Sequence, residues 1–189
     1  MYRAVTLKVL RAGLAANDRK GISDLLASTQ VELRKANGTL IVLLDGRDVT
    51  HEIRSPDVTQ AVSAVSSLRD VREAMVREQR RMGKDGGIVL EGRDIGTVVY
   101  PDADLKFFMI AGIEARARRR LEELHAKGVD ADLKKLRREI EERDRLDSTR
   151  LESPLRKAPD AIEVDTSEMT IAQQVEFVVR RVQERLRQG

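Results

Sequence analysis

Three short, nearly continuous apolar runs constrain the fold more than any other feature of this sequence. They lie at 88–90, 105–110 and 161–164. Runs of this length are typical of strands buried on both faces of a parallel sheet. Helical patterns fill the intervals after the second and third runs, at 113–127, 132–147 and 170–186. The last of them opens with Thr170-x-x-Gln173, which predicts a capping box. Because strands and helices alternate, we expect an α/β fold with a parallel sheet flanked by helices.

The N-terminal part of the chain has a different texture. Helical spacing covers about 2–16, and a Ser-Pro start predicts a helix over 55–67, followed by another over 70–82. Between them, Asn37-Gly38 separates two short strand patterns and Asp45-Gly46 follows the second. Both dipeptides favour tight hairpin turns, because their residues tolerate positive φ. We therefore expect a small antiparallel insertion in the α/β domain.

Composition excludes several classes of protein. With 189 residues the chain suits one domain, and with no cysteine it forms neither disulfides nor thiolate metal sites, as expected in the cytoplasm. No apolar run approaches the roughly 18 residues of a membrane span. A net charge of +3 and 3% aromatic residues are atypical of nucleic-acid binding. The two histidines, His51 and His125, are far apart, which disfavours a histidine-centred metal site or triad.

The loop after the first apolar run carries the first candidate site residues. It reads Glu-Gly-Arg-Asp-Ile-Gly, with Arg93 and Asp94 at its centre. Ligands of open α/β sheets bind at the carboxyl ends of strands, so Arg93 is placed to hold an anion and Asp94 to accept from an amine. The glycines at 92 and 96 allow close backbone approach. An ordinary turn with a solvated Arg-Asp pair is the equally weighted alternative.

A second candidate group lies near position 147. Arg143, Asp147 and Arg150 are spaced i, i+4 and i+7, which places them on one face if the helix continues. Two guanidinium groups beside a carboxylate suit a phosphate together with a sugar hydroxyl. The alternative, which spacing alone favours, is an intrahelical ladder of ion pairs. The arginine-rich stretch from Arg116 is either a solvated surface or a charged lid over a polyphosphate.

Other polar candidates are weak by themselves. Ser63 lies one helical face above Arg72, although a serine within a helix is usually an ordinary surface residue. Tyr2 and Arg3 would normally belong to a frayed terminus. The G-x-x-x-x-G-K-[ST] motif, whose amides cradle phosphates, is absent, because Gly83-Lys84 is followed by aspartate and lacks the upstream glycine.

Several motifs in order give the chain a specific resemblance. They are MYRA, SAVSSLRDVREAMVREQRRM, EGRDIGTVVYPDADLKFFM, EARARRR and EIEERDRLDSTR. Together they resemble the bacterial cytidylate kinases, from the first residue to the last helix. The resemblance implies a P-loop nucleoside monophosphate kinase-like fold, a single domain over 1–189. Within it, about 30–70 would be the nucleotide monophosphate-binding insertion, about 111–150 a helical lid, and the remainder the core.

The resemblance also implies an activity and its participants. The chain would transfer the γ-phosphoryl group of ATP to CMP or dCMP in pyrimidine nucleotide metabolism. Mg²⁺ would be held largely by phosphate oxygens rather than by a protein cage, so no metal ligands are expected. We expect a monomer that binds neither nucleic acid nor a membrane.

The resemblance assigns roles to individual residues. Those implied to bind the CMP phosphate, sugar and base are Tyr2, Arg3, Ser63, Arg72, Arg93, Asp94, Arg143, Asp147 and Arg150. Arg93, Arg143 and Arg150 are the implied catalytic residues, and Arg116 and Arg119 match lid arginines that approach ATP. Asp165-Thr166-Ser167 is expected near the adenine. The hypothesis common to these roles is that Arg3, Arg93, Arg143 and Arg150 converge on one cavity.

The chain departs from the family pattern at its start. The family begins with a strand, the glycine-rich loop and a helix, so this sequence starts roughly thirty residues later in the layout. A misassigned start codon or a shortened gene product would produce this. Without the phosphate cradle, we expect the literal 189-residue chain to be poorly stable and nearly inactive. A non-catalytic CMP-binding protein and, less favoured, a nucleic-acid-binding protein are the alternatives.

Overall fold

A computed structural model describes residues 1–36 and 38–187 of the chain. They form two compact units. Unit 1 comprises Met1–Val89 with Arg150–Glu152, and unit 2 comprises Leu90–Thr149 with the chain from Ser153 onward. The predicted division into insertion, lid and core stays a prediction.

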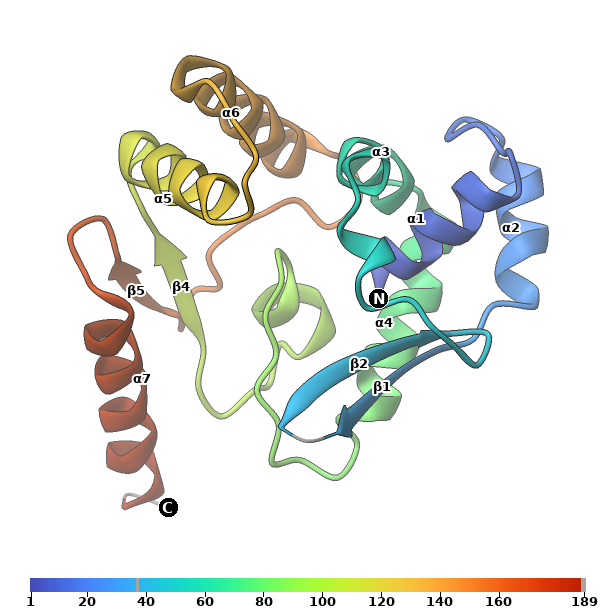
Figure 1. The fold of residues 1–189 in the computed structure, drawn as a ribbon. Coiled ribbons are helices and arrows are strands. Elements are labelled where there is room, and N and C mark those ends of the chain that lie inside the picture. The colour runs from blue at the N-terminus through green and yellow to red at the C-terminus, as the bar shows by residue number, and fades with distance from the viewer. Residues whose placement is uncertain (37, 188–189) are drawn as a thin grey trace. The chain divides into compact units, whose positions relative to one another are not determined.

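Four helices form most of unit 1 (Figure 1). They are α1 (Tyr2–Arg11), α2 (Arg19–Ala27), α3 (Pro56–Ser66) and α4 (Arg69–Met82). The Ser-Pro start predicted for α3 is confirmed, since the Ser55 side chain accepts from the amide of Val58. The first helix is shorter than predicted, because Gly13 follows it at φ +67°. The sequence reading missed α2, which the side chain of Asp18 caps at its N-terminus.

The predicted small antiparallel sheet is present in unit 1, whereas its being an insertion into the α/β domain stays a prediction. Strand β1 (Val31–Ala36) pairs with β2 (Thr39–Leu44), and β2 pairs with the short β3 (Arg47–Asp48). The second turn is confirmed by positive φ values at Asp45 and Gly46. At the first turn Gly38 also has positive φ, while Asn37 lies outside the described residues.

Unit 1 encloses a continuous apolar core. Small branched side chains dominate it, and Val5, Val58 and Val71, from α1, α3 and α4, are fully buried. The hairpin contributes Val31, Val42 and Leu44. Burying such side chains is the main source of stabilisation, at about 1.5–3 kcal/mol each. This core fixes the beginning of α1 beside α3 and α4, which positions the polar residues described below.

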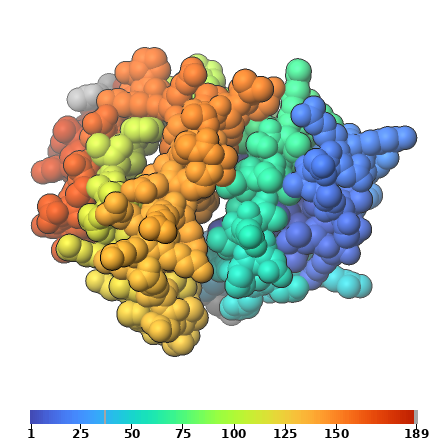
Figure 2. Space-filling model, turned by 90° about the horizontal axis from the view of Figure 1, so that it is seen from above, coloured from blue at the N-terminus to red at the C-terminus, as the bar shows by residue number. Residues whose placement is uncertain are grey.

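Unit 2 contains the parallel sheet. Its strands β4 (Phe107–Ile110) and β5 (Ile162–Asp165) pair in parallel, with Phe107 opposite Ile162. Between them the chain forms α5 (Ile113–His125) and α6 (Leu133–Thr149), which lie side by side, and their yellow and orange surfaces adjoin in Figure 2. The mixed α/β architecture with a parallel sheet is confirmed.

The last helix, α7 (Ile171–Leu186), follows β5. The predicted capping box at its start is confirmed, since Thr170 and Gln173 exchange side-chain and backbone hydrogen bonds. Phe177 makes an edge-to-face contact with Phe107 of β4, with ring centroids 6.4 Å apart. Within the described residues, no helix combines the length and apolar character needed to cross a membrane.

The strand predicted at 88–90 is wrong. This segment has no regular secondary structure, and Val89 is 96% exposed. An apolar run becomes a strand only when a neighbour satisfies its backbone groups. Among the described residues, the parallel sheet consists of β4 and β5 alone, so no strand pairs with the segment.

Candidate active site

Burial singles out three charged residues. Among the described residues, only Arg72, Asp94 and Asp147 are charged and buried over the whole residue, at 4%, 5% and 5% exposure. All three are predicted site residues. Because a buried charge is costly unless it is paired, its presence signals either an ion pair or a binding function.

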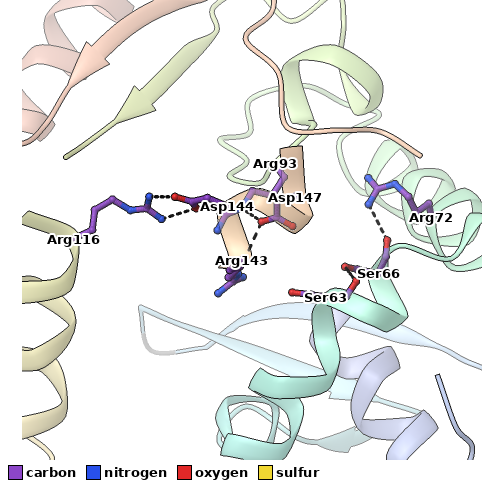
Figure 3. A network of polar contacts seen from close by, with 8 residues as sticks. All are labelled: Ser63, Ser66, Arg72, Arg93, Arg116, Arg143, Asp144 and Asp147. Carbon is purple, nitrogen blue, oxygen red and sulfur yellow. Dashed lines mark hydrogen bonds and ion pairs between the residues drawn. The ribbon is translucent and has the colours of Figure 1, made fainter. Parts of the chain in front are cut away.

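In unit 1, Arg72 is held by groups from the beginning of α1 and the end of α3. Its Nη1 donates to the carbonyl of Ser66 at 3.1 Å, and its guanidinium lies 5.2 Å from the ring centroid of Tyr2. The Ser66 hydroxyl in turn donates to the carbonyl of Ser63 (Figure 3). The structure therefore brings three of the predicted residues, Tyr2, Ser63 and Arg72, into one group.

Arg3 is not part of a frayed terminus. Its Nη1 donates to the carbonyl of Ile53 and to the hydroxyl of Thr59, both at 3.0 Å. These contacts fix a guanidinium one residue after Tyr2. Arg150 also belongs to unit 1, but α6 ends at Thr149, so the predicted helical face through 150 is wrong at its last member.

In unit 2, Asp147 lies between two arginines. Arg93 Nε donates to Asp147 Oδ2 at 2.8 Å, across 54 residues of sequence, and Arg143 Nε is 4.0 Å from the same oxygen (Figure 3). The carboxylate is only 7% exposed, whereas the two arginine side chains are about two-fifths exposed. The contact from Arg93 is long-range, so the alternative of a purely intrahelical ladder is wrong here.

The surroundings of Arg143 favour an added anion. Its Nε is buried without a hydrogen-bond partner among the described residues, since 4.0 Å is too long for such a bond. Burial lowers the pKa of the Arg143 guanidinium, and the charge of Arg93 lowers it further. Asp147 and Asp144 oppose these effects only in part. A bound phosphate would supply both the missing acceptor and the missing negative charge.

The two predicted lid arginines have different partners. Arg116 of α5 makes a two-bond contact with Asp144 of α6, which raises the pKa of the guanidinium. Arg119, one turn later, donates to the carbonyl of Thr166 and more distantly to those of Ser167 and Met169. The structure thus joins Arg119 to the 165–167 segment, as expected if both contribute to one site.

Asp94 begins an unpredicted π-helix. The helix spans Ile95–Val99, and the carbonyl of Asp94 accepts from the amides of Val98 and Val99. Such turns are rare and are frequent at functional sites. At Gly92 an added Cβ would lie 2.8 Å from the Ile95 side chain, so glycine relieves a local contact there, and the close approach of a ligand stays a prediction.

Two polar contributors were missed by sequence reasoning. Ser66 acts through its carbonyl, which no side-chain pattern reveals. Asp144 had a signal, because it lies beside Arg143 and three residues before Asp147, on adjoining positions of a helix. The convergence of the four arginines stays a prediction, since Arg3 and Arg150 belong to unit 1 and Arg93 and Arg143 to unit 2.

Comparison with known proteins assigns the family. The family model for cytidylate kinase matches residues 1–184. A cytidylate kinase from Pelotomaculum thermopropionicum is 52% identical over 183 residues, which cover 96% of this chain and 81% of that protein. One from Geobacillus kaustophilus is 48% identical over 98% of this chain and 83% of the relative, and one from Geobacter sp. strain M21 is 43% identical over 100% and 81%. The chain therefore belongs to the cytidylate kinase family of phosphotransferases.

Proposed function

We propose that the protein transfers the γ-phosphoryl group of ATP to CMP or dCMP, forming CDP or dCDP in pyrimidine nucleotide metabolism. The observation that carries this is the buried Asp147 carboxylate, which holds Arg93 beside Arg143. The family of the chain indicates which ligands this arrangement would bind, since the relatives are named cytidylate kinases. The separation of charge, with a buried carboxylate and half-exposed arginines, suits ligands rich in phosphate.

Unit 1 would bind the acceptor nucleotide. Arg3, fixed by Ile53 and Thr59, and Tyr2 beside it would contact the CMP phosphate and sugar. Ser63 and Arg72 would contact the cytosine edge, together with Asp94 of unit 2. Because Arg72 is already held by the Ser66 carbonyl and the Tyr2 ring, little rotamer freedom is lost when the base binds.

The chemistry requires charge neutralisation rather than a general base. An oxygen of the CMP phosphate attacks the γ-phosphorus, and the bond to the bridging β–γ oxygen breaks. That acceptor oxygen is already deprotonated near neutral pH, so no proton must be removed. Arg93, Arg143 and Arg150 would offset the repulsion between the two phosphates and hold them in line.

Asp94 would select cytosine. A carboxylate accepts from the exocyclic amine of cytosine, whereas uracil presents a carbonyl at that position, so two acceptors would face each other. A site that depends on such a hydrogen bond discriminates strongly. The burial of Asp94 supports this role, because the loss of water from the carboxylate makes an unmatched partner more costly.

The donor side would include the lid arginines Arg116 and Arg119. Mg²⁺ is assigned no protein ligands. No group of three or more acidic or histidine side chains suited to a metal occurs in the part of the chain that the structure describes, and Asp144 and Asp147 are both engaged by arginines. The ion would arrive with the triphosphate, whose oxygens are its natural ligands.

The decisive experiment measures ADP formation by the purified 189-residue chain with ATP and each of CMP, dCMP, UMP and AMP. Turnover with the two cytidine nucleotides well above the other two supports the proposal. It also contradicts the expectation that a chain without the glycine-rich motif is nearly inactive. Calorimetry with CMP and with ATP separately identifies the alternative, since CMP binding without turnover indicates a non-catalytic binding protein. RNA binding that weakens steeply with increasing salt would instead support the alternative of a nucleic-acid-binding protein.

A further inference from the structure

Two carboxylates on α6 hold arginines from other elements in different ways. Asp147 receives Arg93 through Nε, so both terminal amino groups of that guanidinium are left out of the contact. Asp144, one turn earlier, receives both terminal nitrogens of Arg116, Nη1 on one oxygen and Nη2 on the other (Figure 3). Asp147 therefore orients an arginine, whereas Asp144 occupies the end of the guanidinium that would grip a phosphate.

The second contact imitates phosphate binding. A carboxylate and a phosphate both accept the two parallel N–H bonds that the fork of an arginine offers. A guanidinium has five donors, and its two terminal nitrogens form the end that extends farthest from the backbone. As long as Asp144 accepts from both, that end is not available to another anion.

The contact is also accessible and weak enough to exchange. The side chains of Arg116 and Asp144 are 33% and 37% exposed, in contrast to the 7% of Asp147. Water around a partly exposed pair screens the attraction between its charges, so even a two-bond contact can be exchanged for a more highly charged anion. A polyphosphate carries several charges, so it competes effectively with a single exposed carboxylate. The carboxylate of an orienting contact, by comparison, is expected to be buried, as that of Asp147 is.

We propose that Asp144 is an internal competitor for the polyphosphate-binding end of Arg116. It occupies this guanidinium when no nucleotide is present and gives it up when a polyphosphate binds. The proposal deepens the proposed function in one respect, because it takes Arg116 to be a ligand of the donor nucleotide. It concerns the polyphosphate alone and needs neither cytosine recognition nor phosphoryl transfer.

The test is the affinity of the full chain for inorganic tripolyphosphate, measured by calorimetry at low ionic strength. Asp144→Asn removes the competing charge and nearly preserves the shape of the side chain. We expect tripolyphosphate to bind about two- to fivefold more tightly than to the unaltered chain. The gain is informative when it exceeds that of a variant that loses another exposed carboxylate, because the loss of one negative charge by itself raises the affinity for an anion slightly at low ionic strength.

The matched control is Glu114→Gln. Glu114 of α5 pairs with Arg137 of α6 at 2.8 Å, so this variant also removes one exposed carboxylate from an ion pair between the same helices. Its net charge changes by the same amount, and tripolyphosphate affinity should stay within about 1.5-fold. A gain as large as that of Asp144→Asn would attribute the effect to overall charge and overturn the proposal.

A double-mutant cycle completes the design. In an Arg116→Gln background, Asp144→Asn should no longer increase the affinity, because the competition acts through Arg116. An unchanged gain in that background, no gain in the single variant, or no tripolyphosphate binding by either chain would overturn the inference. Failure to phosphorylate CMP, with the affinity gain intact, would refute the proposed function and leave the inference supported.

Discussion

The two units of this chain are stabilised in different ways. Unit 1 contains the apolar core, in which residues from α1, α2, α3, α4 and the hairpin are buried together. In unit 2, α7 buries no residue, and its apolar side chains are largely exposed, as shown by Ile171 at 79%, Val175 at 56% and Leu186 at 75%. Among its described residues unit 2 buries fewer apolar side chains than unit 1, namely Val99, Ala117, Leu136, Ala158 and Val164. Long-range arginine contacts, to Asp144, Asp147 and Thr166, also connect its elements.

This difference between the units implies that fold stability depends mainly on unit 1 and that the arginines proposed for chemistry lie largely in unit 2. Apolar burial stabilises a fold strongly and without direction, whereas exposed ion pairs contribute little to stability but fix side chains at defined positions. Unit 1 should therefore be sensitive to the loss of volume, and the arginine contacts of unit 2 should affect activity more than stability. The following predictions test that contrast.

The largest effect on stability is expected from a matched pair of isoleucines. Ile22 of α2 is 1% exposed, so Ile22→Ala should lower the free energy of unfolding by about 2–5 kcal/mol. Ile171→Ala, at an exposed helix position, should change it by less than about 0.5 kcal/mol. Urea denaturation followed by circular dichroism measures both. Equal losses would show that the apolar face of α7 is covered in solution.

Arg93→Lys should reduce activity strongly and stability little. Lysine keeps a positive charge near Asp147 but lacks the two-pronged fork that grips a phosphate. We expect turnover to fall about 10²–10³-fold in the kinase assay, with a small change in Tm. Arg145→Lys is the control, since Arg145 pairs with the exposed Glu142 of its own helix. Equal activity of the two variants would remove Arg93 from the catalytic group.

Asp94 should govern the choice of base rather than the rate. Asp94→Ala should lower the preference for CMP over UMP about 10–100-fold, which corresponds to the loss of a charged hydrogen bond, while turnover with CMP falls less. In Asp94→Asn, the side-chain amide can donate to the uracil carbonyl, so the preference should shift further toward UMP. The test is to measure kcat/KM of each variant with CMP and with UMP. Equal losses of kcat/KM with the two nucleotides would contradict the role of Asp94 in base selection.

The smallest effect is expected at a partly buried ion pair of unit 1, between Lys8 and Asp45. Partial burial raises the pKa of Asp45, but hydrogen bonds from the Gln30 amide and the ion pair with Lys8 outweigh it and hold the pKa below its ordinary value. The stabilisation is therefore present above the unfolded-state pKa and is lost as pH falls through the folded-state pKa. Asp45→Asn should cost about 0.5 kcal/mol at pH 7 and nothing at pH 2, measured by urea denaturation. If the two chains differed in free energy of unfolding by the same amount at pH 7 and pH 2, the effect would come from the Asp45-Gly46 turn and not from the ion pair.

Local signals in the sequence were sufficient for much of the fold. The Ser-Pro start of α3, the capping box of α7 and the Asp45-Gly46 turn depend on contacts within a few residues, and each is confirmed. The alternation of apolar runs and helices likewise indicated the α/β architecture and the parallel pairing of β4 with β5. The run at 88–90 shows the limit of this reading, because strand formation requires a partner elsewhere in the chain.

The candidate site shows the same limit, because the sequence indicated its residues but not their long-range contacts. The residue types and spacing of Arg93, Asp94, Arg143 and Asp147, read with the family resemblance, were enough to name them as candidates. Spacing could not distinguish an ordinary helical ladder from the observed contact, since Arg93 reaches Asp147 across 54 residues. It could not assign Asp144 a partner either, because Arg116 belongs to another helix.

The sequence by itself therefore determined most of the helices, several caps and turns, the α/β class and the charged residues available for chemistry. These properties follow from side-chain chemistry and from interactions over one or two helical turns. Only the tertiary structure decided which carboxylate holds which arginine, through which nitrogen, and how exposed each pair is. Those choices depend on distances between segments far apart in the chain, and the free energies of burial and of ion pairing are fixed by these distances and not by residue type alone.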